Sequence, residues 1–142
     1  MDVIRRDTDY AFRLAATLAR RGTDGLPMSA RSLSQQTHVS YALTCKLLQK
    51  LAAAGIVSST MGPKGGFVLA KRPEAITFGQ VIEAIQGQVS VIRCLMGDFK
   101  CPLKCACPVN PKLKQMQQQI DGFLNEATLA EFIQTERQNK NG

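Results

Sequence analysis

The sequence predicts a mainly α-helical fold that carries one β-hairpin and ends with a long helix. Apolar residues recur three and four positions apart in several segments, and capping residues bound these segments. The glycine-rich stretch Gly62-Pro63-Lys64-Gly65-Gly66 separates two short strand-like stretches, as in a hairpin. The 142 residues, 44% of them hydrophobic, are enough for one domain with a buried core.

Three helices are predicted before the hairpin. The first begins after Asp7-Thr8 and ends at Arg20-Arg21-Gly22, and four residues form its apolar face: Ala11, Leu14, Ala15 and Leu18. Ser29 is placed to cap a short second helix that reaches about Gln36. Ser40 caps a third helix that reaches Ala54 and stops at Gly55. The short connection between the second and third helices is typical of a helix-turn-helix.

Three helices are predicted after the hairpin. Thr77 and Gln80 form a capping box for the first of them, which ends at Gly87. Asn110-Pro111 starts a long helix with an apolar seam, made of Leu113, Met116, Ile120, Phe123 and Ala127. Thr128 opens a short last helix, and the polar stretch 134–142 is expected to fray.

This order predicts four segments. Residues 1–90 form a winged helix-turn-helix DNA-binding domain, since three helices followed by a hairpin wing define that module. A cysteine-rich loop occupies 91–109, a dimerisation helix and a short terminal helix occupy 110–134, and a polar tail occupies 135–142. Packing of the seam within its own subunit is the alternative to dimerisation. Gly122, in the middle of the seam, is best understood where another backbone comes close.

Charge and the exposed side of the third helix favour double-stranded DNA as the partner. The net charge is +7, from 18 basic and 11 acidic residues. Gln49 is suited to adenine, and Tyr41 and Ala42 to thymine methyls or phosphates. Basic side chains are assigned to phosphates, namely Arg31, Lys46, Lys50 and Lys64. Ser40 and Cys45 complete the proposed contact surface, and a winged helix that contacts only protein is the alternative.

Four of the five cysteines lie within fourteen residues: Cys94, Cys101, Cys105 and Cys107. The chain has no secretory signal and no apolar run long enough to cross a membrane, so we expect a cytoplasmic protein. In that reducing compartment, clustered thiols indicate an iron–sulfur cluster, a zinc site or a bare thiol switch. The residues alone leave these three open. No nucleophile–base–acid set is evident, so we expect no enzyme.

The chain resembles the Rrf2 family of bacterial winged-helix transcriptional regulators, which includes IscR-, NsrR- and RirA-like iron–sulfur sensors. The resemblance rests on "DTDYAFRLAATLA", "LLQKLAAAGIV", "GPKGGFVLAKRPEAIT", "FGQVIEAIQG", the cysteine pattern and "GFLNEATLAEF". It implies a homodimeric regulator whose operator affinity follows the state of a 2Fe–2S or 4Fe–4S cluster, and we expect this regulator to act as a repressor. Nitric oxide, iron supply and redox state are the signals implied.

The resemblance also implies a set of cluster ligands. These are Cys94, Cys101 and Cys107, with Asp9 of the partner subunit as a fourth ligand. Cys105 has no counterpart in the family pattern and is the alternative fourth ligand. Met61 stands where some relatives insert an arginine into the minor groove, so minor-groove reading is not expected to transfer. His38, the only histidine, is expected to serve the turn before the third helix.

Overall fold

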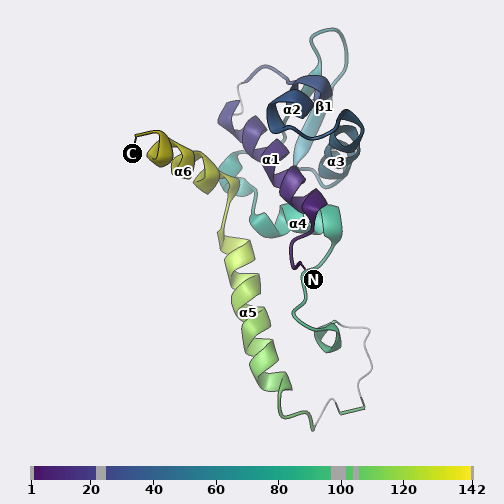
Figure 1. The fold of residues 1–142 in the computed structure, drawn as a ribbon, viewed down its shortest axis with the longest axis vertical. Helices are drawn as coiled ribbons and strands as arrows, with labels where there is room; N and C mark the ends of the chain where they lie inside the picture. Colours follow the sequence, from purple (N-terminus) through teal and green to yellow (C-terminus); the bar gives the residue numbers. More distant parts are fainter. Residues whose placement is uncertain (1, 22–24, 97–101, 104–105, 142) are drawn as a thin grey trace.

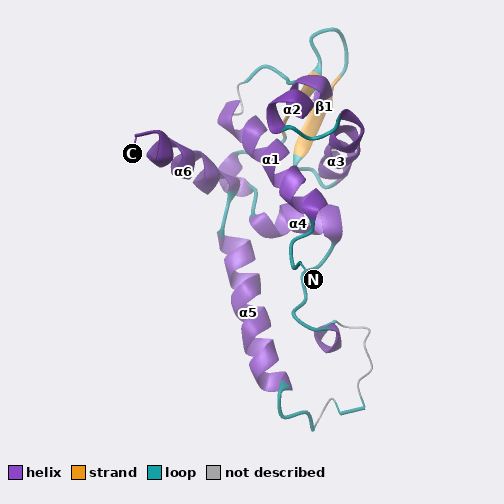
Figure 2. Cartoon of the chain, viewed as in Figure 1, coloured by secondary structure: helices purple, strands orange, loops and turns teal. Residues whose placement is uncertain are grey.

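The computed structural model describes residues 2–21, 25–96, 102–103 and 106–141 (Figure 1). Six α-helices, two strands and two 3₁₀ turns follow one another in the described residues. In chain order they are α1 (Arg6–Arg21), α2 (Ala30–Thr37), α3 (Tyr41–Ala53), β1 (Val57–Thr60), β2 (Gly66–Leu69), η1 (Pro73–Ala75), α4 (Phe78–Gln86), η2 (Arg93–Leu95), α5 (Asn110–Glu126) and α6 (Leu129–Asn141). The mainly helical fold with one hairpin is therefore confirmed (Figure 2). No described helix is long and apolar enough to cross a membrane.

The core lies among α1, α2, α3 and the hairpin. The four residues predicted for the apolar face of α1, Ala11 to Leu18, are all buried. They pack with Leu33 of α2 and with Leu47 and Leu51 of α3, which are fully buried. The helical period of three to four residues therefore located the inner faces of these helices.

Local side-chain caps set the helix boundaries as predicted. The Ser29 hydroxyl accepts a hydrogen bond from the Ser32 amide at 3.1 Å, and the Ser40 hydroxyl accepts one from the Leu43 amide at 3.3 Å. Thr77 and Gln80 form the reciprocal capping box at the start of α4. These bonds satisfy amides that have no partner inside the first helical turn.

The wing is a two-stranded antiparallel sheet in which Val57 pairs with Leu69 and Thr60 with Gly66. On its other side, strand β2 contacts the segment before α2: Phe67 exchanges two backbone hydrogen bonds with Met28, at 3.0 and 2.7 Å. Gly66 is required there, because a Cβ atom at this position would lie 2.4 Å from the Met28 carbonyl oxygen. Met28, two residues before α2, therefore holds strand β2 of the wing against the helix-turn-helix.

Helix α5 extends away from the compact part of the molecule, and α6 packs against α1 near its start while its other end projects outward (Figure 1). Every residue of α5 is described and none is buried. An aromatic cluster joins α5 to the core: Phe78 of α4 contacts Phe12 of α1 at 5.0 Å, Phe123 of α5 at 6.1 Å and Phe132 of α6 at 4.7 Å between ring centroids.

Two features differ from the expectation. Ala127 is buried in the core of its own subunit, where its carbonyl accepts a hydrogen bond from the Phe78 amide, so it does not belong to an outward-facing seam. Helix α6 runs to Asn141 and includes most of the expected polar tail. Glutamine, glutamate, arginine and lysine are good helix formers, which explains why this polar segment continues the helix.

Candidate nucleic-acid interface and cysteine loop

Helix α3 presents the predicted contact surface to solvent. Ser40, Ala42, Lys46 and Gln49 are exposed, and Tyr41 is 49% exposed. Cys45 and Lys50 are half-buried. The opposite side of the same helix is fixed by the buried Leu47, Leu48 and Leu51. One face of α3 is therefore anchored in the core while the other is free to meet a partner.

The side chains of Arg31 in α2 and Tyr41 in α3 stack on each other. The guanidinium carbon of Arg31 lies 4.9 Å from the centroid of the Tyr41 ring, within cation–π range. Stacking leaves the guanidinium edge free to donate hydrogen bonds while it fixes the position of the phenol ring. The sequence placed both residues on the DNA-facing side but gave no sign that they touch each other.

The turn between α2 and α3 depends on His38. This residue adopts a left-handed conformation, with φ 58° and ψ 34°, and its backbone amide donates to the Ser34 carbonyl. Among the described residues it is the only one other than glycine with a positive φ. The expected turn role of His38 is therefore observed.

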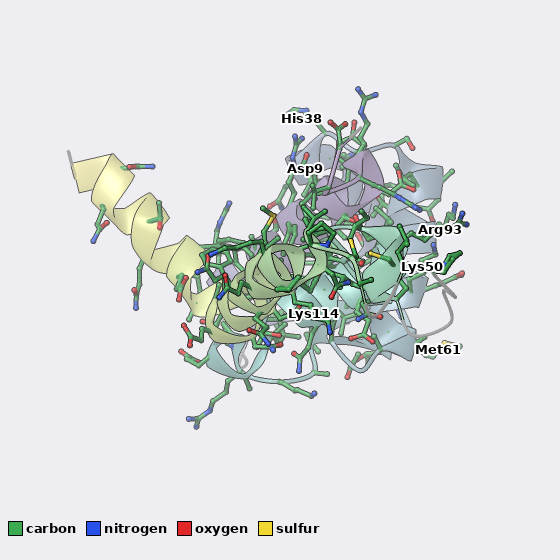
Figure 3. The ribbon with its side chains drawn as sticks, turned by 90° about the horizontal axis from the view of Figure 1, so that it is seen from below. Asp9, His38, Lys50, Met61, Arg93 and Lys114 are labelled. Carbon is green, nitrogen blue, oxygen red and sulfur yellow. The ribbon has the colours of Figure 1, made fainter. Side chains whose placement is uncertain are left out.

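The wing tip carries the remaining predicted contact. Lys64 is exposed, and the neighbouring Met61 is 94% exposed. The Gly65 amide donates to the Gly62 carbonyl at 2.9 Å and closes the tip. Viewed along the long axis, Lys50 of α3 and Met61 of the wing project on the same side of the molecule, opposite α6 (Figure 3). Helix α3 and the wing tip can therefore face one partner together.

The structure describes part of the cysteine loop. Cys94 lies in η2, Cys107 lies three residues before α5, and both are half-buried free thiols. Cys101 and Cys105 lie outside the described residues. Among the residues that are described, no three cysteine, histidine or acidic side chains come together as a metal site. The predicted ligand set therefore stays a prediction.

Asp9 has a partner within its own helix. Its carboxylate accepts a hydrogen bond from the Arg13 guanidinium at 2.9 Å, one helical turn away, and both side chains are about half exposed. Such a pair on a solvated surface contributes little to stability. Asp9 is thus accessible on the first turn of α1, as ligation from a partner subunit would require.

Two glutamines that the sequence analysis did not single out hold the backbone near the loop. Gln117 of α5 bonds to Val89 and Val91, and Gln86 of α4 bonds to the segment that precedes α1. Both side chains are polar and neither caps a helix, so periodicity and capping rules gave no signal for them.

The helix-turn-helix, its wing and the exposed face of α3 define a winged-helix transcriptional regulator. The chain belongs to the Rrf2 family, whose model is described as an iron-dependent transcriptional regulator and matches residues 4–135. The resemblance noted from the sequence is confirmed. This is a family of regulators, in agreement with the expectation of a non-enzymatic protein.

Known relatives agree with this assignment. The chain is 32% identical over 124 residues to the HTH-type transcriptional regulator IscR of Yersinia enterocolitica, covering 87% of this chain and 74% of that protein. CymR of B. subtilis, a global cysteine regulator, matches with a TM-score of 0.77 and 26% identity over 95% of this chain and 98% of that one. IscR of T. potens has the same fold, with a TM-score of 0.71 and 22% identity over 94% and 87% of the two chains.

Proposed function

We propose that this protein is a cytoplasmic, homodimeric repressor whose affinity for operator DNA is controlled by an iron–sulfur cluster in loop 91–109. One observation carries the proposal: the loop with four cysteines connects α4, at the base of the winged helix, directly to α5, the helix with the exposed apolar face. Cysteines of this loop that held a cluster would couple its state to the connection between the DNA-binding domain and the dimerisation helix. The description of the family as iron-dependent supports the same reading.

The DNA-binding part of the proposal rests on α3 and the wing. We assign base contacts in the major groove to Gln49, Tyr41 and Ala42, which are exposed on the outer face of α3. Phosphate contacts are assigned to four basic residues: Arg31, Lys46, Lys50 and Lys64. The net charge of +7 favours association with a polyanion.

Dimerisation is assigned to α5, because its apolar side chains remain accessible. Phe123 is 63% exposed and Met116 is 51% exposed, and Leu113 and Ile120 are half-buried. Large apolar side chains in one stripe on an extended helix favour pairing with a second apolar surface. A second copy of the chain supplies an identical stripe by two-fold symmetry, which also matches the symmetry of most operators.

The donor set fits an iron–sulfur cluster. Cys94, Cys101 and Cys107 would hold it, with Asp9 of the other subunit or Cys105 as the fourth ligand. Thiolates are the usual ligands of such clusters, and a bound cluster supplies bonds that iron loss, oxidants or nitric oxide can break. Cys94 and Cys107, at the two ends of the loop, are not engaged in disulfides. The donor chemistry therefore suits soft-metal binding.

A zinc- or thiol-based regulator without a cluster is the second candidate. Cys45 favours it, because this half-buried thiol lies on the DNA-facing side of α3, where oxidation would add polarity and bulk. The extra cysteine in the loop, Cys105, also suits a tetrahedral zinc site of four thiolates.

Anaerobic purification followed by iron and sulfide analysis and visible absorption tests the cluster. We expect a coloured protein that loses its colour in Cys94→Ala, Cys101→Ala and Cys107→Ala but keeps it in the control Cys45→Ala. Bleaching in Cys105→Ala but not in Asp9→Ala would identify the fourth ligand as Cys105. A colourless protein with one bound zinc ion would establish the second candidate instead.

Selection from a random duplex pool, followed by binding measurements, tests the DNA contacts. We expect Gln49→Ala to relax the sequence preference, because it removes a base contact. Lys64→Ala should weaken all duplexes alike and reduce the slope of log affinity against log salt by about one unit. The same uniform loss in both variants would contradict the assigned roles.

A further inference from the structure

One side chain of the long helix holds the backbone that leads into the cysteine loop. The Oε1 atom of Gln117 accepts a hydrogen bond from the Val91 amide at 2.7 Å, and its Nε2 donates to the Val89 carbonyl at 2.9 Å. The same Nε2 donates to the Asp121 carboxylate at 2.8 Å, one helical turn along α5, which fixes the orientation of the amide. Gln117 thus takes the place of a strand partner for residues 89–91, satisfying one donor and one acceptor.

The link extends from Val91 to Cys94. The Ser90 hydroxyl donates to the Ile92 carbonyl at 2.8 Å, and η2 is closed by hydrogen bonds from the Leu95 amide to Ile92 and from the Met96 amide to Arg93. Cys94 lies inside this turn, three residues after Val91. The position of its thiol therefore depends on how Gln117 holds the preceding backbone.

A second glutamine connects the other end of the same segment to α1. The Oε1 atom of Gln86 accepts hydrogen bonds from the Arg5 amide at 2.9 Å and from the Thr8 hydroxyl at 2.7 Å, and its Nε2 donates to the Val3 carbonyl at 2.9 Å. Thr8 is fully buried, so this contact reaches into the core. Only four residues separate Gln86 from Val91.

We propose that Gln117 positions Cys94, and that Gln117 and Gln86 together transmit the state of the cysteine loop to the winged helix. The physical path runs from η2 through residues 89–91 to α5 on one side, and through Gln86 to the start of α1 on the other. The transmission to DNA rests on the proposed cluster function. The positioning of Cys94 does not, because it follows from contacts within a single iron-free chain.

Thiol labelling of the iron-free protein tests the positioning. Gln117→Leu is compared with Gln118→Leu, a matched control on the exposed surface of the same helix. Maleimide labelling resolved by peptide mass spectrometry reports the rate at Cys94, with Cys45 as an internal reference on α3. We expect Gln117→Leu to label Cys94 about fivefold faster, as loss of a net hydrogen bond allows, with Cys45 unchanged. Gln117→Glu, which keeps an acceptor for the Val91 amide but sets a carboxylate oxygen against the Val89 carbonyl and Asp121, should also label Cys94 faster than the Gln118→Leu control.

Two labelling results would overturn the positioning role. One is a Cys94 rate in Gln117→Leu that stays within twofold of the unmodified protein. The other is an equal increase at Cys94 and Cys45, which would show a general loss of stability. Should Gln117→Leu fail to fold, Gln117→Glu decides, and a Cys94 rate equal to that of the Gln118→Leu control would then count against the role.

Operator binding by cluster-loaded and iron-free protein tests the transmission. The ratio of the two dissociation constants should move at least about fivefold toward one in Gln117→Leu and in Gln86→Leu, and should be retained in Gln118→Leu. An unchanged ratio in both variants would refute transmission. An unmodified protein that binds no cluster would refute the proposed cluster function, and with it transmission, whereas the labelling experiment would still decide the positioning of Cys94.

Discussion

Substitution of Gly122 by alanine should stabilise α5 if this helix stands alone. The same substitution should weaken the dimer if α5 meets a second backbone at this residue. Apart from its two chain neighbours and the nearby backbone of α5, no atom of the described chain lies within 4 Å of a Cβ atom built at Gly122. Packing within its own subunit therefore does not require glycine at this position. A second copy of α5 that crosses at Gly122, as the proposed dimer predicts, would bring its backbone to this position.

The free-energy change expected for Gly122→Ala differs in sign between an isolated helix and a helix crossing. For an isolated helix, alanine in place of glycine stabilises by about 1 kcal/mol, which raises the melting temperature by about 4 °C for a chain of this size. At a helix crossing, a methyl group forced against a backbone costs about 2 kcal/mol in each subunit. The dimer then loses about 4 kcal/mol, a factor of roughly 1,000 in its dissociation constant.

Sedimentation over a dilution series measures the dissociation constant, and thermal melts at the same concentrations measure stability. We expect Gly122→Ala to dissociate at concentrations where the unmodified protein is dimeric. Lys114→Ala, an exposed position on the side of α5 opposite Met116 and Phe123, is the control and should leave the dimer intact. A Gly122→Ala protein that melts higher and keeps its dissociation constant would refute the proposed crossing at this residue.

Four further substitutions test the fold and the predicted DNA-contact surface. Thr44→Val should stabilise the protein by about 1 kcal/mol in denaturant unfolding, because the buried Thr44 hydroxyl has no hydrogen-bond partner among the described residues; a loss of stability would show an undetected partner. Gly66→Ala should destabilise by about 3 kcal/mol, since its methyl group would meet the Met28 carbonyl, and unchanged melting would contradict that close approach. Arg31→Ala and Tyr41→Ala should weaken operator binding non-additively, with a coupling of about 1 kcal/mol in a double-mutant cycle, whereas additive losses would show two independent contacts.

Features set by neighbours in the sequence were predictable. Ser29, Ser40 and the Thr77–Gln80 box act within one helical turn, so their residue types and spacing identified the starts of α2, α3 and α4. The buried face of α1 followed from helical periodicity for the same reason. The exposed residues of α3 were predictable because they lie opposite that helix's buried leucines.

Features set by contacts between distant segments were not predictable. Gln86 bonds to residues about 80 positions earlier in the chain, and an isolated polar residue on a helix carries no pattern that reveals such a bond. The pairing of Arg31 with Tyr41 depends on the angle between α2 and α3. The length of α6 was underestimated because its polar residues lack an apolar period, although their helix propensity is high.

The ring of Phe123 belongs to two surfaces at once. One edge touches the half-buried Phe78 of α4, while most of the ring remains exposed on the flank of α5. A neighbouring helix laid along that flank would press on the same ring that supports the core. Any sliding or rotation between two such helices would therefore reach Phe78, and from it Phe12 on α1, through direct van der Waals contact.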